Sequence, residues 1–227
     1  MDKKLTAAVD TDKLRDQLFH KIKESIFSGE FDTEEVFTEV SIAKRYQVSR
    51  TPAHDALHML ESERLIEPVG KRGFKLSLMQ EADLSHIFDA AKAFEGMTAE
   101  LVAKNHDDEL IAGLKEIVSG MLRPQIDVYS EELVSKNRNI DFEFHTQIAK
   151  ASKNPYLYQC VRMIQEKILV RNIYNPIIQY YLVEPEPFSA CTHERILEAI
   201  ALGDAALARH LMVRHFILIE ELLKKYM

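Results

Sequence analysis

The sequence predicts a mostly α-helical protein, with a winged helix-turn-helix at residues 1–78 and an all-helical bundle at residues 79–227. Apolar residues recur at helical spacing along most of the 227-residue chain. A short polar turn near residue 47 separates two of the expected helices, and two β-type runs flank residues 70–73. Because no strand pattern follows residue 80, the rest of the chain is expected to be helical.

The first expected helix spans residues 12–27 and ends before Gly29, which can act as a helix stop. A second, shorter helix is expected over residues 38–46, with Thr38 as its N-cap. The first helix shows one apolar face, formed by Leu14, Leu18, Ile22 and Ile26.

The third expected helix follows a tight turn at residues 47–49. Ser49 can cap it, and Pro52 falls in its first turn, where a missing N–H costs nothing. Residues 65–69 and 74–78 then predict two short strands. Three helices followed by a hairpin with a basic tip are typical of a winged helix-turn-helix.

Six amphipathic helices are expected in the second half. Asp107, Asn154 and Asp204 supply breaks and caps between them. No Gly-, Ser- or Pro-rich stretch separates the two halves, so the boundary is a change of architecture rather than a flexible linker. The expected helices span residues 81–104, 109–121, 127–152, 155–173, 188–202 and 205–225.

Composition excludes several protein classes. The chain is 46% hydrophobic and 29% charged, which is too apolar for a disordered protein. No apolar run reaches the roughly 18 residues that span a membrane, and the N-terminus does not resemble a signal peptide. Two cysteines, Cys160 and Cys191, do not make a disulfide framework, so a cytoplasmic protein is expected.

The charge distribution permits contact with double-stranded DNA. The net charge is −7, but residues 44–75 carry seven Lys and Arg against four Asp and Glu. The local field at a surface patch decides such contact. A helix enters the major groove with its N-terminal residues near the bases, where Arg50 could pair with guanine. Each residue alone could equally be ordinary solvated surface. The candidate DNA-contacting residues are Ser49, Arg50, Thr51, His54, Lys71 and Arg72.

A second constellation lies in the acidic half. Asp141 and His145 are four residues apart on one helix face, while His193 and His215 lie on apolar stripes of two other helices. Imidazole nitrogens and carboxylate oxygens are preferred ligands of divalent transition metals. The spacing therefore predicts a metal site in the bundle core, with Zn first and Ni, Fe or Mn as alternatives.

Ordinary core roles are also open to these residues. Any one of the histidines could be a hydrogen-bonded core residue. Asp141 could form a salt bridge with Arg138 or Arg171, because a carboxylate on an apolar face needs a partner.

Residues 12–78 resemble the GntR family of bacterial repressors. The resemblance rests on residues 48–61, on residues 65–68 and on the wing at residues 70–74. Two positions where the family usually has arginine are Val40 and His54 here, and only Arg50 remains of the habitual three. The resemblance thus implies DNA binding, with an operator that differs from the usual one.

Residues 81–225 resemble the metal-containing, all-helical effector domain (FCD domain) of the FadR-like branch of that family. The matching stretches are 141–145, 152–155 and 192–216. The resemblance implies that Asp141, His145, His193 and His215 hold a divalent metal.

The resemblance also implies a small carboxylic acid as effector. The family places an arginine four residues before a glutamate of the domain's first helix. Here the glutamate is Glu95 and the arginine position is Ala91, so other side chains would have to hold the acid. The candidate effector-binding residues are Lys92, Arg162, Arg171 and Tyr174.

Together these features predict a ligand-responsive transcriptional repressor that binds a near-palindromic operator as a homodimer and is not an enzyme. Three alternatives use the same residues differently. A metal-dependent, hydrolase-like enzyme would activate water at the site. A metal-level sensor would respond to the metal alone, and a metal-free regulator would use the histidines to line a pocket.

Overall fold

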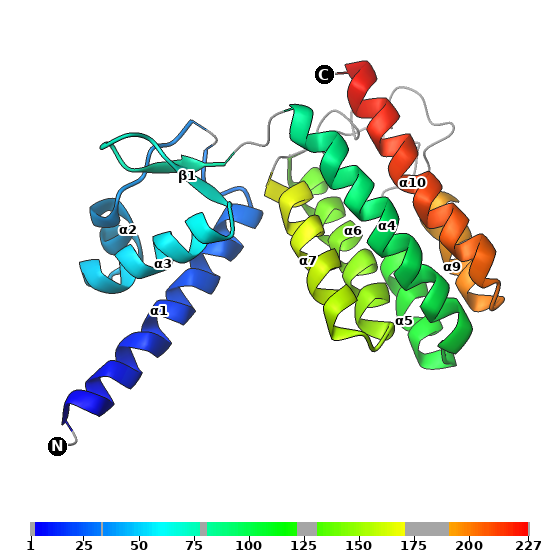
Figure 1. Cartoon of the computed structure of the whole chain (residues 1–227), viewed down its shortest axis with the longest axis horizontal. Helices are drawn as coiled ribbons and strands as arrows, with labels where there is room; N and C mark the ends of the chain where they lie inside the picture. Colours follow the sequence, from blue (N-terminus) through cyan, green and yellow to red (C-terminus); the bar gives the residue numbers. More distant parts are fainter. Residues whose placement is uncertain (1–2, 33, 78–80, 122–130, 171–190, 227) are drawn as a thin grey trace. The chain divides into compact units, whose positions relative to one another are not determined.

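A computed structural model describes residues 3–32, 34–77, 81–121, 131–170 and 191–226. The chain divides into two compact units, Met1–Leu78 and Met79–Met227 (Figure 1). The described part is mostly helical, and its one sheet is a two-stranded hairpin in the first unit. The predicted fold class, a winged helix-turn-helix followed by an all-helical bundle, is confirmed.

The first unit contains three helices, α1 (Lys3–Phe27), α2 (Glu39–Tyr46) and α3 (Arg50–Ser62). Helix α1 begins well before residue 12, where the sequence predicted its start. The prediction followed the apolar face, whereas Lys, Leu and Ala before it favour helix without needing burial and no Gly or Pro interrupts them. The core includes Leu18, Ile22, Ile26, Ile42, Ala56, Leu57 and Leu60.

Backbone hydrogen bonds to side chains set the start of α2. Thr38 Oγ1 accepts a hydrogen bond from the Ser41 N–H at 3.1 Å, and Ser41 Oγ accepts one from the Thr38 N–H at 2.8 Å. This capping box confirms Thr38 as the N-cap. The prediction that Ser49 caps α3 is correct for its position and wrong for its side chain. Ser49 occupies the N-cap position, but its side chain makes no capping hydrogen bond.

The wing is a short antiparallel hairpin of β1 (Ile66–Pro68) and β2 (Phe74–Leu76). Both strands are shorter than predicted: β1 lacks Leu65 and Val69, and β2 ends at Leu76, while Leu78 lies outside the described residues. Phe37, before α2, extends the hairpin by exchanging two 2.8 Å backbone hydrogen bonds with Phe74. Gly73 makes this contact possible: its φ is +131°, and a Cβ there would lie 2.4 Å from the Phe37 carbonyl oxygen.

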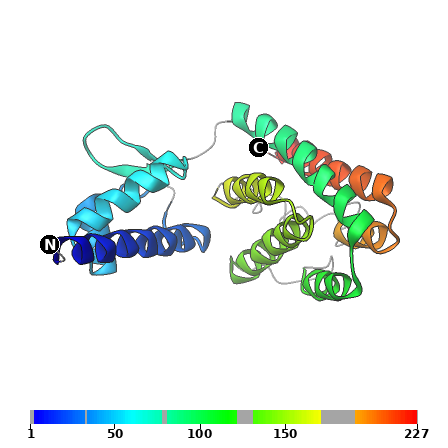
Figure 2. The same ribbon diagram turned by 60° about the horizontal axis from the view of Figure 1, so that its bottom comes forward.

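The described helices of the second unit are α4 (Glu81–Asn105), α5 (Asp108–Ser119), α6 (Glu131–Ala151), α7 (Pro155–Val170), α9 (Cys191–Ala201) and α10 (Ala205–Tyr226). Helices α4 and α10 lie side by side in both views (Figures 1 and 2). Asp107, Asn154 and Asp204 accept backbone hydrogen bonds at the starts of α5, α7 and α10, as predicted. Residues 127–130, 171–173 and 188–190 of the predicted helices lie outside the described residues.

The core of the second unit lies between these helices. Its largest fully buried side chains include Phe88 of α4, Phe144 of α6 and Phe216 of α10. None of the described helices is long and apolar enough to cross a membrane. The apolar core surrounds the residues that the sequence singled out as metal ligands.

Candidate functional site

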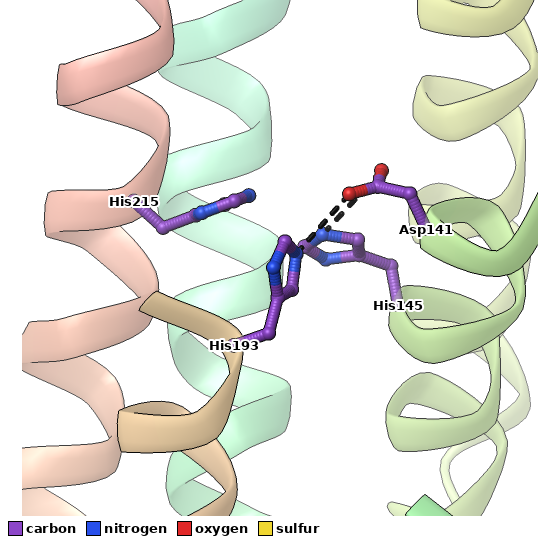
Figure 3. Close-up of side chains that lie close together, drawn as sticks. All are labelled: Asp141, His145, His193 and His215. Atoms are coloured by element: carbon purple, nitrogen blue, oxygen red, sulfur yellow. Dashed lines mark ion pairs between the residues drawn. The ribbon is translucent and has the colours of Figure 1, made fainter. Parts of the chain in front are cut away.

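Three helices of the second unit bring the four predicted ligand residues together (Figure 3). Helix α6 supplies Asp141 and His145, α9 supplies His193, and α10 supplies His215. One potential ligand atom from each side chain lies within 4.8 Å of the others. The i, i+4 spacing places Asp141 and His145 on one face of α6, and this face points toward the other two helices.

The cluster is buried and its polar atoms face one another. His193 Nε2 lies 3.1 Å from Asp141 Oδ1, and His145 Nε2 lies 3.9 Å from Asp141 Oδ2. All four side chains are buried. Ligand atoms bound to one ion at about 2.0–2.2 Å would lie within about 4.4 Å of one another. Only a small contraction would therefore convert the cluster into a coordination sphere.

The pKa of Asp141 and the pKa of His215 are both lowered in the cluster. The shift favours the charged form of the acid and the neutral form of the histidine. Burial alone would raise the pKa of Asp141, but a hydrogen bond with His193 and the charges of the three imidazoles hold it well below its usual range. Burial, reinforced by His193 and His145, holds the pKa of His215 well below its usual value. An ionised carboxylate beside a neutral imidazole is the protonation state that a cation requires.

His215 gives the clearest indication that the cluster fits a metal. Among the residues that the structure describes, neither of its ring nitrogens has a hydrogen-bond partner, although both are fully buried. A buried polar atom without a partner costs about 1–3 kcal/mol. Three imidazoles and one carboxylate are also a donor set that Zn and its neighbours accept. The observed residues therefore fit a divalent transition metal, and a bound ion would satisfy His215.

Aromatic rings pack around the imidazoles. The ring centroids of Phe144 and His193 are 5.0 Å apart, and those of Phe216 and His145 are 5.3 Å apart, in edge-to-face and tilted arrangements. These apolar rings are buried and help to bury the imidazoles. Electrostatic interactions inside the cluster are therefore stronger than they would be at the surface.

The sequence analysis missed one residue that contacts the cluster, Glu95, and a second residue, Gln165, that contacts Glu95. His145 Nδ1 makes a hydrogen bond with Glu95 Oε2 from α4, and Gln165 Nε2 from α7 donates to Glu95 Oε1 at 2.7 Å. Burial lowers the pKa of His145, but the Glu95 carboxylate outweighs it and raises that pKa overall. Separations of 50 and 70 residues give no local spacing from which these contacts could be predicted.

The predicted effector-binding residues are only partly described. Lys92 Nζ lies 2.7 Å from Asp89 and 3.0 Å from Glu220, so it joins α4 to α10. Arg162 Nε donates to Glu166 at 2.9 Å on α7. Arg171 and Tyr174 lie outside the described residues. No described contact places Lys92 or Arg162 beside the metal-ligand cluster.

The predicted DNA-contacting residues lie on the surface of the first unit. Ser49, Arg50 and Thr51 are exposed at the N-terminal end of α3, and Lys71 and Arg72 are exposed at the tip of the wing. His54 is also exposed, but its Nδ1 lies 2.9 Å from Glu39 Oε1 of α2. The His54 ring is therefore paired with a neighbouring carboxylate. Val40, the other position where the family usually has arginine, is exposed.

Comparison with known proteins matches both units to described families. Residues 14–76 match the bacterial regulatory proteins of the gntR family, and residues 86–217 match the FCD domain. The HTH-type transcriptional repressor GlaR of Escherichia coli is 25% identical over 199 residues, covering 86% of this chain and 89% of GlaR. The gluconate operon transcriptional repressor of Bacillus subtilis is 24% identical, covering 83% and 76%.

Solved structures share the fold. E. coli McbR/YncC superposes with a TM-score of 0.75 at 16% identity, covering 93% of this chain and 97% of that one. A putative GntR regulator from a Rhodococcus species gives a TM-score of 0.75 at 16% identity, covering 94% and 98%. The family and these sequence relatives are transcriptional regulators and not enzymes. The chain belongs to the GntR family of bacterial transcriptional regulators and carries an FCD domain after its winged helix-turn-helix.

Proposed function

We propose that this regulator is a repressor whose affinity for DNA is controlled by a small organic acid bound at a metal ion in the second unit. Residues 1–78 would bind the DNA, and residues 79–227 would bind metal and effector and support a homodimer. A homodimer would read a near-palindromic operator with two copies of α3. Two of the relatives are repressors, which supports repression rather than activation by this chain.

The observation that carries the proposal is the buried cluster with its unpartnered imidazole. Asp141, His145, His193 and His215 would hold the ion, which would offer a binding position to an oxygen ligand such as a carboxylate. A site of this kind, enclosed in the effector-domain core of a regulator, supports a sensing role. Control of DNA affinity additionally requires that the acid binds the DNA-competent and DNA-incompetent states with different affinities.

The exposed surface of the first unit supports the DNA-binding part. Arg50 at the start of α3 has the guanidinium geometry for a bidentate contact with guanine. Lys71 and Arg72 at the wing tip have the charge for phosphate contacts. Because the His54 ring contacts Glu39, we expect the operator position facing this pair to differ from one read by arginine.

Elemental analysis of the purified full-length chain tests the metal first, with wild type beside His193→Ala. About one metal ion per chain in wild type, lost in the variant, is expected. No metal after reconstitution with Zn, Ni and Mn would overturn the metal site. The second unit would then act as a metal-free binding domain.

Binding to DNA tests the control. Duplexes selected from a random-sequence pool by the Zn-loaded protein are titrated by fluorescence anisotropy, with and without a panel of small carboxylic acids. A large affinity change with Zn plus one acid, absent in His193→Ala, is expected. A change with Zn alone would instead identify a metal-level sensor, and no change under any condition would overturn the proposed control.

A further inference from the structure

A buried chain of hydrogen bonds extends from the metal-ligand cluster into two more helices. Gln165 of α7 donates to Glu95 of α4, and Glu95 in turn contacts His145 of α6. We propose that Glu95 is a positioning residue that fixes the ring of His145 so that its Nε2 faces the ion. This inference rests on the metal site of the proposed function and deepens it.

The two nitrogens of His145 have different environments. Nδ1 faces Glu95 Oε2, whereas Nε2 points toward the cluster and lies 3.9 Å from Asp141 Oδ2. A carboxylate only accepts hydrogen bonds, so Glu95 favours the ring form that carries its proton on Nδ1. That form leaves the lone pair of Nε2 directed at the cluster, as a metal ligand requires.

Glu95 is itself held in place. It is 1% exposed, and both of its oxygens are engaged, Oε1 by Gln165 and Oε2 by His145. Burying a carboxylate is costly unless it is paired and hydrogen-bonded. The hydrogen bond from Gln165 fixes Oε1 of Glu95, and this also fixes the orientation of Oε2. Gln165 of α7 therefore helps to hold the His145 ring in place.

His215 provides the contrast within the same cluster. Its two ring nitrogens are buried without a hydrogen-bond partner in the described part of the chain, so no acceptor there selects its ring form. His145 is therefore the preorganised ligand and His215 the ligand that the ion must orient. Removal of the Glu95 carboxylate should weaken metal binding because it abolishes this preorganisation.

Zinc affinity of the full-length chain, measured by competition with a chromophoric chelator, tests the inference. Glu95→Leu removes the acceptor and is expected to weaken Zn binding about 10–100-fold. Glu95→Gln keeps an amide oxygen that can accept from Nδ1, so it should lose less. Glu100→Gln is the matched control, because Glu100 lies on the same helix but contacts Lys104 and Arg209. It should bind Zn like wild type.

A second measurement does not depend on metal. In the metal-free chain, at a pH high enough for the His145 ring to be neutral, its ¹⁵N shifts should show the proton on Nδ1 in wild type, and a loss of this preference in Glu95→Leu. A wild-type chain that binds no Zn would overturn the proposed metal site. Tight binding by wild type with equal affinity in Glu95→Leu, or a His145 ring protonated on Nε2 in wild type, would overturn the role of Glu95 alone. If Glu95→Leu fails to fold, the Zn affinity of Glu95→Gln and the ¹⁵N shifts of wild type still test the role of Glu95.

Discussion

The two candidate sites of this regulator differ most in their exposure to water. Arg50, Thr51 and Lys71 of the first unit are exposed, whereas Asp141 and His145 of the second unit are buried. Exposed polar groups keep their hydration, so their presence costs the fold little. Buried polar groups lose hydration and must find partners. The candidate DNA-contacting surface can therefore vary without loss of stability, whereas the candidate metal cluster is part of the core.

This contrast predicts which property each substitution changes. Substitutions on the exposed surface should alter DNA affinity and leave the free energy of unfolding near that of wild type. Substitutions at the cluster should alter metal binding, and those in the packing around it should alter stability. Each side of this division can be tested by substitution.

The largest effect is expected at the aromatic wall of the cluster. Phe144 is fully buried and packs on the rings of His145 and His193. Phe144→Ala should lower the unfolding free energy of the second unit by about 3–5 kcal/mol, through lost burial and a residual cavity. Tyr156→Ala, at a side chain that is 78% exposed, should change it by less than about 0.5 kcal/mol. Hydrogen exchange in urea, read from amides of the second unit, makes the measurement. Equal losses in the two variants would contradict the division between surface and core.

The next effect concerns the ligands themselves. His215→Ala removes one of four donors and should weaken Zn binding by more than about 100-fold, beyond the range of a residue that acts through a ligand. His210 lies on the same helix but is exposed, so His210→Ala should bind Zn like wild type. Chelator competition compares the pair. A normal affinity in His215→Ala would remove this residue from the site.

A smaller effect is expected at the start of α3. Arg50→Ala should weaken binding to the selected operator by about 1–3 kcal/mol and relax the sequence preference at one base pair. Its urea unfolding should match that of wild type, because the side chain is exposed. Anisotropy with matched and mismatched duplexes measures the affinity and the preference. Equal weakening on every duplex would show that Arg50 contacts phosphate rather than a base.

The smallest effect is expected at the wing tip. Lys71→Ala should weaken binding similarly on all sequences and reduce the slope of log affinity against log salt by about 0.9, the value for one lost phosphate contact. Titrations at several salt concentrations measure the slope. An unchanged slope would place Lys71 away from the DNA backbone.

The same contrast explains how much could be predicted from sequence. Helical periodicity located the helices of both units, and Asp141 and His145 were recognised because their spacing puts them on one turn of helix. Thr38, Asp107 and Asp204 were recognisable as caps because a cap depends on neighbouring residues. His193 and His215 were added because they lie on apolar stripes of two other helices, and the resemblance to a known family supported the set of four.

Contacts between distant residues escaped the sequence analysis. Glu95 contacts His145, and Gln165 contacts Glu95, only because α4, α6 and α7 pack against one another. A lone buried Glu carries no sequence signal of its partner. The bridge between Phe37 and Phe74 likewise depends on how the chain returns to the hairpin. The early start of α1 was missed because helix propensity without an apolar face leaves no periodic pattern.

Gly73 has a consequence for how this regulator can evolve. Because a side chain there would collide with the Phe37 carbonyl oxygen, the position is closed to substitution, and it holds the backbone of the tip through a 2.7 Å hydrogen bond with Val69. Lys71 and Arg72, just before it, are exposed and carry none of the core. Selection can therefore exchange these two residues freely while a single glycine preserves the shape of the wing. Such an arrangement would allow descendants of this chain to change the strength of the proposed phosphate contacts without refolding the wing.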